Sequence, residues 1–168
     1  MQTKVIGGTV LQVDGPTQIA GTQHSLWVLT LPDGSVVIVR EESHGLGGSP
    51  CAIQPPSGPD VWHYNIEYQK PRGNRGNKTT VFNLHMAVWR HGNDTCFSCW
   101  NINPKRCIYS NCIDGDQMNR VQDTIREVAN SVLQALQAVA EVSWEVAMAI
   151  AAAILWILTT PFRQNAFA

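Results

Sequence analysis

The feature that most constrains this chain is a change of apolar periodicity near residue 116. Before it, short segments of alternating apolar and polar residues are separated by Gly, Pro and Asp, which is typical of strands and turns. After it, apolar residues recur every three or four positions, and no Gly or Pro interrupts residues 117–160. The sequence therefore predicts an α+β protein, with an N-terminal β domain and a long C-terminal helix.

An apolar segment at residues 4–13 is followed by a clear hairpin signal. Residues 26–31 and 36–40 are rich in apolar and β-branched side chains, and they flank the turn Pro32-Asp33-Gly34-Ser35. Proline suits the first corner of such a turn, and glycine suits a position with positive φ. We therefore expect two antiparallel strands joined at this turn.

A second hairpin is expected to join residues 61–69 to residues 80–90, with a register set by side-chain size. When residues whose numbers sum to 148 face each other, the large apolar side chains share one face of the pair, which fixes a register. The facing pairs are then Trp62 and Met86, Tyr64 and Leu84, Ile66 and Phe82, and Tyr68 and Thr80. On the other face His63 would oppose His85, and two facing histidines are candidate metal ligands. The alternative is a polar face that is solvated or covered by a subunit.

The loop of this second hairpin carries four basic residues, Lys70, Arg72, Arg75 and Lys78. Four charges would bind phosphate or an anionic surface only weakly and in a salt-sensitive way. Because the net charge of the chain is −1, we expect a solvated hairpin tip and no specific nucleic-acid partner.

Short strands with frequent turn signals predict a small antiparallel barrel or sandwich over residues 1–92. The opening of the chain, an apolar strand and then a hairpin through Leu31-Pro-Asp-Gly34, resembles the OB-type barrels of phage tail-spike and baseplate hub proteins over residues 4–40. That resemblance implies a closed barrel and a place in a phage particle.

Residues 93–115 are predicted to be a Cys-rich linker, or neck, between the two halves. It contains Cys96, Cys99, Cys107 and Cys112, whereas Cys51 stands apart. The short spacing of the first two cysteines suits a zinc or iron–sulfur centre. Two disulfides would staple the segment equally well, and free thiols are a third alternative. The first eight residues contain no apolar leader, so we expect no N-terminal secretory signal.

Residues 116–160 are predicted to form one helix with a heptad repeat. Its expected oligomer interface consists of β-branched residues at the a and d positions, namely Ile125, Val128, Val132, Val139, Val142 and Val146. A second apolar stripe that includes Leu133, Leu136 and Ile150 runs beside the first, which favours a coiled coil or helical bundle of three or more copies. The alternative is a helical hairpin that folds back on itself or on the β domain.

The end of this helix is a candidate membrane segment. Residues 146–162 contain no charged side chain, and such a length is at the lower limit for crossing a bilayer. A membrane tail anchor is therefore a close alternative to a buried bundle core.

The prediction of function starts from the low content of charged residues in the chain. Only 15% of its residues are charged, against roughly 25% in soluble domains, which indicates surface hidden from water. No catalytic constellation is evident, and no cofactor is expected beyond a possible metal at the cysteines. We expect a non-enzymatic structural subunit of a large homo-oligomeric assembly, with a virion or phage particle as its setting and other assembly proteins as partners. The alternatives are a tail-anchored membrane protein whose β domain binds a ligand or metal, and a pore-forming toxin.

Overall fold

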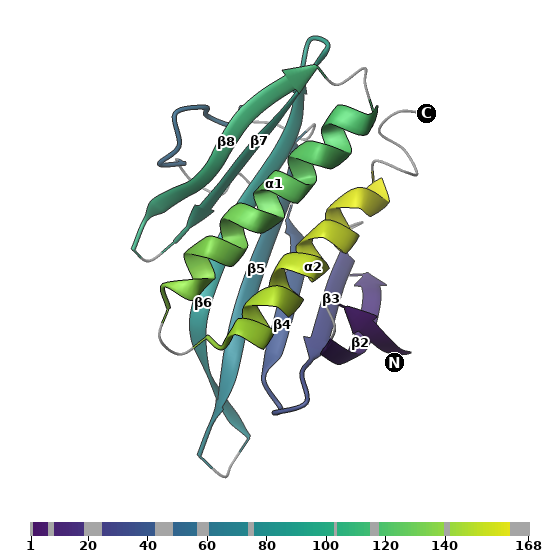
Figure 1. Cartoon of the computed structure of the whole chain (residues 1–168), viewed down its shortest axis with the longest axis vertical. Coiled ribbons are helices and arrows are strands. Elements are labelled where there is room, and N and C mark those ends of the chain that lie inside the picture. The colour runs from purple at the N-terminus through teal and green to yellow at the C-terminus, as the bar shows by residue number, and fades with distance from the viewer. Residues whose placement is uncertain are drawn as a thin grey trace.

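The computed structural model consists of one antiparallel sheet with two helices on one of its faces (Figure 1). It describes residues 2–6, 9–18, 25–42, 49–56, 61–73, 76–102, 104–114, 118–139 and 142–161. The strands are β1 (Gln2–Ile6), β2 (Thr9–Gln18), β3 (Ser25–Thr30), β4 (Val36–Glu42), β5 (Val61–Arg72), β6 (Asn77–His91), β7 (Asp94–Asn101) and β8 (Arg106–Asp114). The helices are α1 (Met118–Gln137) and α2 (Trp144–Pro161).

The sheet is open, so the expected barrel or sandwich is wrong. Its eight strands lie in chain order from β1 to β8, and those two strands form opposite edges. The resemblance to OB-type barrels over residues 4–40 therefore does not extend to the fold. Local turn signals specify hairpins but do not specify closure, and here two helices cover the apolar face that a barrel would bury against itself.

The expected neck is also part of the sheet, since residues 94–101 and 106–114 form β7 and β8. The two strands pair with each other along their length, and β7 also pairs with β6. Every residue of β7 from Thr95 to Trp100 is buried. A strand buried on both faces has little alternation of polar and apolar residues, which is why this segment does not resemble a half-buried strand.

The first predicted hairpin is confirmed. Strands β3 and β4 pair from Leu26 opposite Arg40 to Thr30 opposite Val36. Gly34 adopts a φ of 85°, and the amide of Leu31 donates to the carbonyl of Ser35 at 2.8 Å. The carboxylate of Asp33 accepts from the amide of Ser35 at 2.9 Å. Slight burial would raise the pKa of Asp33, but hydrogen bonds from Ser35 outweigh it and hold that pKa below its ordinary value.

The second hairpin forms with the predicted faces and a different register. Strands β5 and β6 pair Tyr64 with Met86, Ile66 with Leu84, and Tyr68 with Phe82, so each partner is two positions from the predicted one. Because side chains alternate with a period of two, a shift of two residues keeps every side chain on the same face. A bulge between Tyr68 and Gln69 then changes the register toward the hairpin tip.

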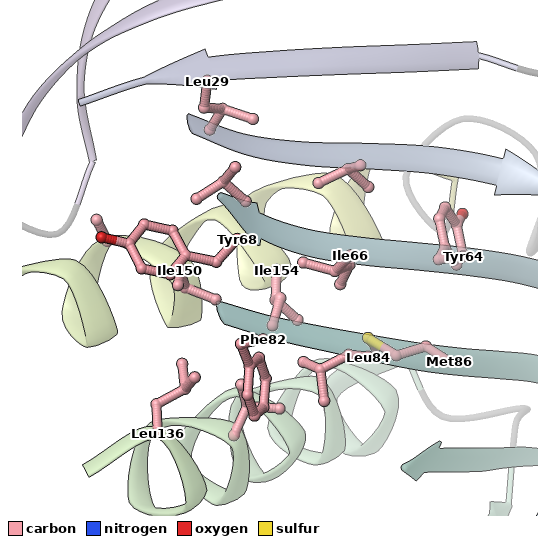
Figure 2. Packing of buried hydrophobic residues seen from close by; sticks show 14 of the residues in the cluster. Leu29, Tyr64, Ile66, Tyr68, Phe82, Leu84, Met86, Leu136, Ile150 and Ile154 are labelled. Carbon is pink, nitrogen blue, oxygen red and sulfur yellow. The ribbon is translucent and has the colours of Figure 1, made fainter. Parts of the chain in front are cut away.

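The main hydrophobic core lies between the sheet and the helices, on what we call the inner face. Its largest fully buried side chains include Tyr64, Tyr68, Leu84, Leu136 and Ile150. Figure 2 shows residues of this core from the strands beside Leu136, Ile150 and Ile154 from the helices. The alternation of β5 and β6 therefore supplies one side of the core, and the apolar stripes of the helices supply the other.

The C-terminal half is two helices, so the expected single helix over residues 116–160 is wrong. Helix α1 ends in tight turns in which the amide of Val139 donates to the carbonyl of Leu136 at 3.0 Å. Ser143 then caps α2, because its hydroxyl accepts from the amide of Val146 at 3.3 Å. Such a cap satisfies a helix N-terminus without Gly or Pro. The two helices pack against each other and on the sheet, which is the alternative of a hairpin folding back on the β domain.

The expected coiled coil and helical bundle are wrong, and so is the alternative of a membrane span. No helix among the described residues, which end at residue 161, is long and apolar enough to cross a membrane, which contradicts the alternative of a membrane segment at residues 146–162. Val146, Ala147, Ala149, Ile150 and Ile154 of α2 are instead buried in the inner core. A helix with two apolar faces needs two neighbours, and the sheet and α1 supply them within one chain.

Candidate functional site

Two disulfides lie on the outer face of the sheet, opposite the helices. Cys96 of β7 faces Cys112 of β8 in the strand register, with their Cα atoms 4.0 Å apart, and the two are bonded. Cys51 is bonded to Cys107, across a sequence separation of 56 residues. A disulfide sulfur is not a thiolate, so a zinc or iron–sulfur centre at these residues would require both bonds to be reduced.

The remaining cysteine, Cys99, is a buried free thiol that packs in the inner core. The sequence grouped Cys99 with Cys96, but residues three apart on a strand point to opposite faces. Burial raises the pKa of the Cys99 thiol. The fourth cysteine in the two disulfides is therefore Cys51 rather than Cys99. Cys51 is distant from β8 in the sequence, and the tertiary fold brings it to that strand.

An irregularity in β8 places both of its cysteines on the outer face. Cys107 and Cys112 are five residues apart, so a regular strand would send them to opposite faces. The register shifts between Cys99 opposite Tyr109 and Trp100 opposite Cys107, which leaves Ile108 as an extra residue in β8. Because this bulge shifts the alternation of side chains by one residue, Cys107 and Cys112 lie on the same face of the sheet. Both pack against the cluster of Trp89, Cys96 and Trp100.

This outer cluster is a second, smaller core covered by the irregular segment at residues 49–56. Its buried members are Cys51, Val61, Ala87, Trp89, Cys96 and Trp100. The hydroxyls of Ser49 and Ser98 lie 2.9 Å apart in a buried hydrogen bond. The amide of Ile53 donates to the hydroxyl of Ser110 at 3.2 Å. The covering segment is therefore fixed by a disulfide and by polar contacts.

The two histidines predicted as metal ligands share the outer face but do not face each other. His63 lies opposite Ala87, and His85 lies opposite Asn65. The ring of His85 packs edge-on against Trp100 with centroids 5.6 Å apart, and Asn65 donates to Asn83 at 3.0 Å. Among the described residues, no group of three His, Cys, Asp or Glu side chains could hold a metal ion.

The residues expected at an oligomer interface belong to the core of the single chain. Ile125, Val128 and Val132 are fully buried in the inner core, and Val142 and Val146 are buried there too. Val139 is half-buried and packs against the same core. The stripe that predicted self-association thus covers the sheet of its own chain.

The edges of the sheet are the surfaces open to another chain. In the part of the chain that the structure describes, β1 pairs only with β2 and β8 pairs only with β7. At the first edge Val5 faces Val10, and these side chains are 69% and 50% exposed. Apart from the bulge at Ile108, β8 runs from Arg106 to Asp114 with no charge or proline between them.

A groove of about 410 Å³ lies between the last turns of α1 and the start of β8. Its apolar lining includes Phe82, Ile108 and Val139, and its polar lining includes Gln134 and Arg106. No sequence signal marks this groove, because its walls come from β6, from the β7–β8 hairpin and from α1. Its volume is in the range of small-molecule sites, roughly 300–1,000 Å³.

No protein-family model, curated protein or solved structure significantly matches this chain.

Proposed function

We propose that this protein is a non-enzymatic structural subunit that assembles with copies of itself through the edges of its sheet. The observation that carries the proposal is the open sheet, in which β1 and β8 each have one described partner strand. The outer N–H and C=O groups of an edge strand form a template for pairing with another chain. An edge is therefore a ready site for assembly.

The directions of the strands make the two edges compatible with each other. All seven neighbouring pairs in the sheet are antiparallel, so β1 and β8 run in opposite directions. A second copy in the same orientation would place its β1 antiparallel to β8 of the first copy, which continues the ladder. Because this contact joins two different surfaces, it produces rings or filaments rather than a closed dimer.

The composition of the edges supports the proposal. Proteins that remain monomeric protect edge strands with lysines, prolines, bulges or covering segments. Here β1 has Lys4 as its one charged residue and β8 has a bulge at Ile108, but neither strand contains proline and β8 has no charge between Arg106 and Asp114. The exposed pair of Val5 and Val10 adds apolar surface beside the first edge.

The low charge of the chain supports the same reading, since a subunit packed among copies exposes less surface to water. For the assembly we propose a virus or phage particle as the setting, on the analogy of other subunits that repeat a β-sheet contact.

The proposal is tested by blocking one edge at a time with a lysine. Val5→Lys alters β1 and Asn111→Lys alters β8, where both native side chains are exposed. We expect the native chain to form oligomers that grow with concentration in light scattering, and each variant alone to be monomeric. An equimolar mixture of the two variants should form dimers, because each still has the edge that the other lacks.

Asn77→Lys is the matched control, since it adds the same charge at an exposed position of β6, which is not an edge strand of the sheet. This variant should assemble like the native chain. A native chain that is monomeric at every concentration would overturn the proposal. Dimers of Asn111→Lys alone would also overturn it, because they would show that two β1 edges pair with each other.

A further inference from the structure

We propose that the groove between α1 and β8 binds a small amphipathic carboxylate. The apolar body of the ligand would lie against Phe82, Ile108 and Val139, and its carboxylate would pair with Arg106. This site is formed within the single chain, and one of its walls is the edge strand β8.

Charge gives the strongest argument for the class of ligand. Among the described residues, Arg106 is the only charged side chain that lines the groove, and no ion pair joins it to another described side chain. The other arginine side chains with a defined partner lie elsewhere, as Arg40 contacts Glu67 at 3.8 Å and Arg126 contacts Asp123 at 3.0 Å. One guanidinium with no acidic side chain among the described lining residues fits one carboxylate, which it can bind with two parallel hydrogen bonds.

The rest of the lining selects for an apolar body with few polar groups. Phe82 is buried in the inner core at the base of the groove, and Ile108 and Val139 pack against the same core. Asn101, Ser131 and Gln134 add amide and hydroxyl groups that could bind a second polar atom of the ligand. An apolar pocket with a few polar groups is the usual composition of a small-molecule site.

The walls of the groove are held in place by contacts outside it. Cys107, which lines the groove, is fixed to Cys51 by a disulfide. The hydroxyl of Tyr109 donates to the carboxylate of Glu127 at 3.0 Å, which joins β8 to α1. A site whose walls are already ordered loses less entropy on binding a ligand.

The proposal is tested by isothermal titration of the full chain with decanoate, and with decanol as the neutral analogue. We expect one decanoate per chain and at least tenfold weaker binding of decanol. Arg106→Gln should weaken decanoate binding about tenfold, which is the order expected for loss of a charged hydrogen-bonded pair. Its affinity for decanol should change by less than about twofold.

Lys105→Gln is the matched control, because it removes the same charge from the neighbouring exposed residue, which does not line the groove. It should leave decanoate binding within about twofold of the native value. Ala135→Trp should fill the groove and abolish binding of both probes, with circular dichroism used to confirm that the variant folds. Ser131→Phe is the second filling variant if Ala135→Trp does not fold.

The proposal is overturned by any of three results. The first is a native chain that does not bind decanoate at all. The second is an equal loss of binding in Arg106→Gln and Lys105→Gln, which would show a diffuse electrostatic attraction. The third is a folded filling variant that binds decanoate as tightly as the native chain, which would place the probe elsewhere.

Discussion

The two faces of the sheet are buried in different ways. The inner face is covered by two regular helices, and its core is apolar with one free cysteine, Cys99. The outer cluster, which is the smaller core on the other face, is covered by the irregular segment at residues 49–56 and contains both disulfides. A helix satisfies its own backbone and presents a continuous apolar stripe, whereas an irregular segment does neither. The two disulfides thus lie on the face of the sheet whose cover has no regular secondary structure.

The largest expected effect is the loss of the disulfide that fixes the covering segment. The bond between Cys51 and Cys107 closes a loop of 56 residues, so Cys51→Ala with Cys107→Ala should lower the free energy of unfolding by about 4 kcal/mol. The bond between Cys96 and Cys112 spans 16 residues, and its removal should cost about 3 kcal/mol. Urea titrations of the two double variants measure both values.

Limited proteolysis locates the effect of the first double variant. Cleavage within residues 49–56 should accelerate in Cys51→Ala/Cys107→Ala far more than in Cys96→Ala/Cys112→Ala. Equal rates in the two variants would show that the covering segment is held by packing, and the proposed difference between the two faces would then be lost.

On the inner face, Leu136→Ala should lower the free energy of unfolding by about 3 kcal/mol through the cavity it leaves. Leu136 is fully buried between α1 and the sheet. Gln137→Ala is the control, because its side chain is exposed on the same helix and its replacement should change stability by less than about 0.5 kcal/mol. A loss below about 1 kcal/mol for Leu136→Ala would mean that the helices contribute little to this core.

The smallest effect concerns the buried thiol of the inner face and appears only at alkaline pH. Because burial raises the pKa of Cys99 above its ordinary value of 9.0, the unfolded chain ionises first and stability falls as pH rises above that value. At one pH unit above it, the loss from this group should be about 1.4 kcal/mol. Cys99→Ala should remove that part of the alkaline decrease, whereas Tyr64, whose pKa is also raised by burial, contributes at higher pH.

Thiol titration checks the same residue directly. Without reductant, the native chain should react slowly or not at all, and the chain unfolded in urea should expose one thiol. Two or more reactive thiols in the unfolded chain would contradict the disulfide pairing of the outer cluster.

Predictions made from the sequence hold where the interaction is local. The turn at residues 32–35 is set by Pro32, Asp33 and Gly34 themselves, and the hairpin around it forms as expected. The faces of β5 and β6 were also predictable, because alternation assigns each side chain to a side of the sheet. The register was not, since a shift of two residues changes every partner and no face.

The helical half of the chain shows where prediction from the sequence fails. Apolar stripes indicate that two surfaces must be covered, but they do not indicate whether the partner is a second chain or the chain's own sheet. The break at Ser143 was signalled only by a good N-cap residue followed by Glu145. The candidate sites depend still more on tertiary structure, because the groove and the pair of Cys51 and Cys107 join segments distant in sequence.

The order of elements has a consequence for synthesis. Every strand that the structure describes precedes the two helices in the chain, so a ribosome completes this sheet before it makes the cover of the inner face. Each strand can pair with the one just made, which favours early hairpin formation from near contacts. The apolar inner face then waits for α1 and α2, and in that interval the nascent chain is most exposed to aggregation and most dependent on a chaperone.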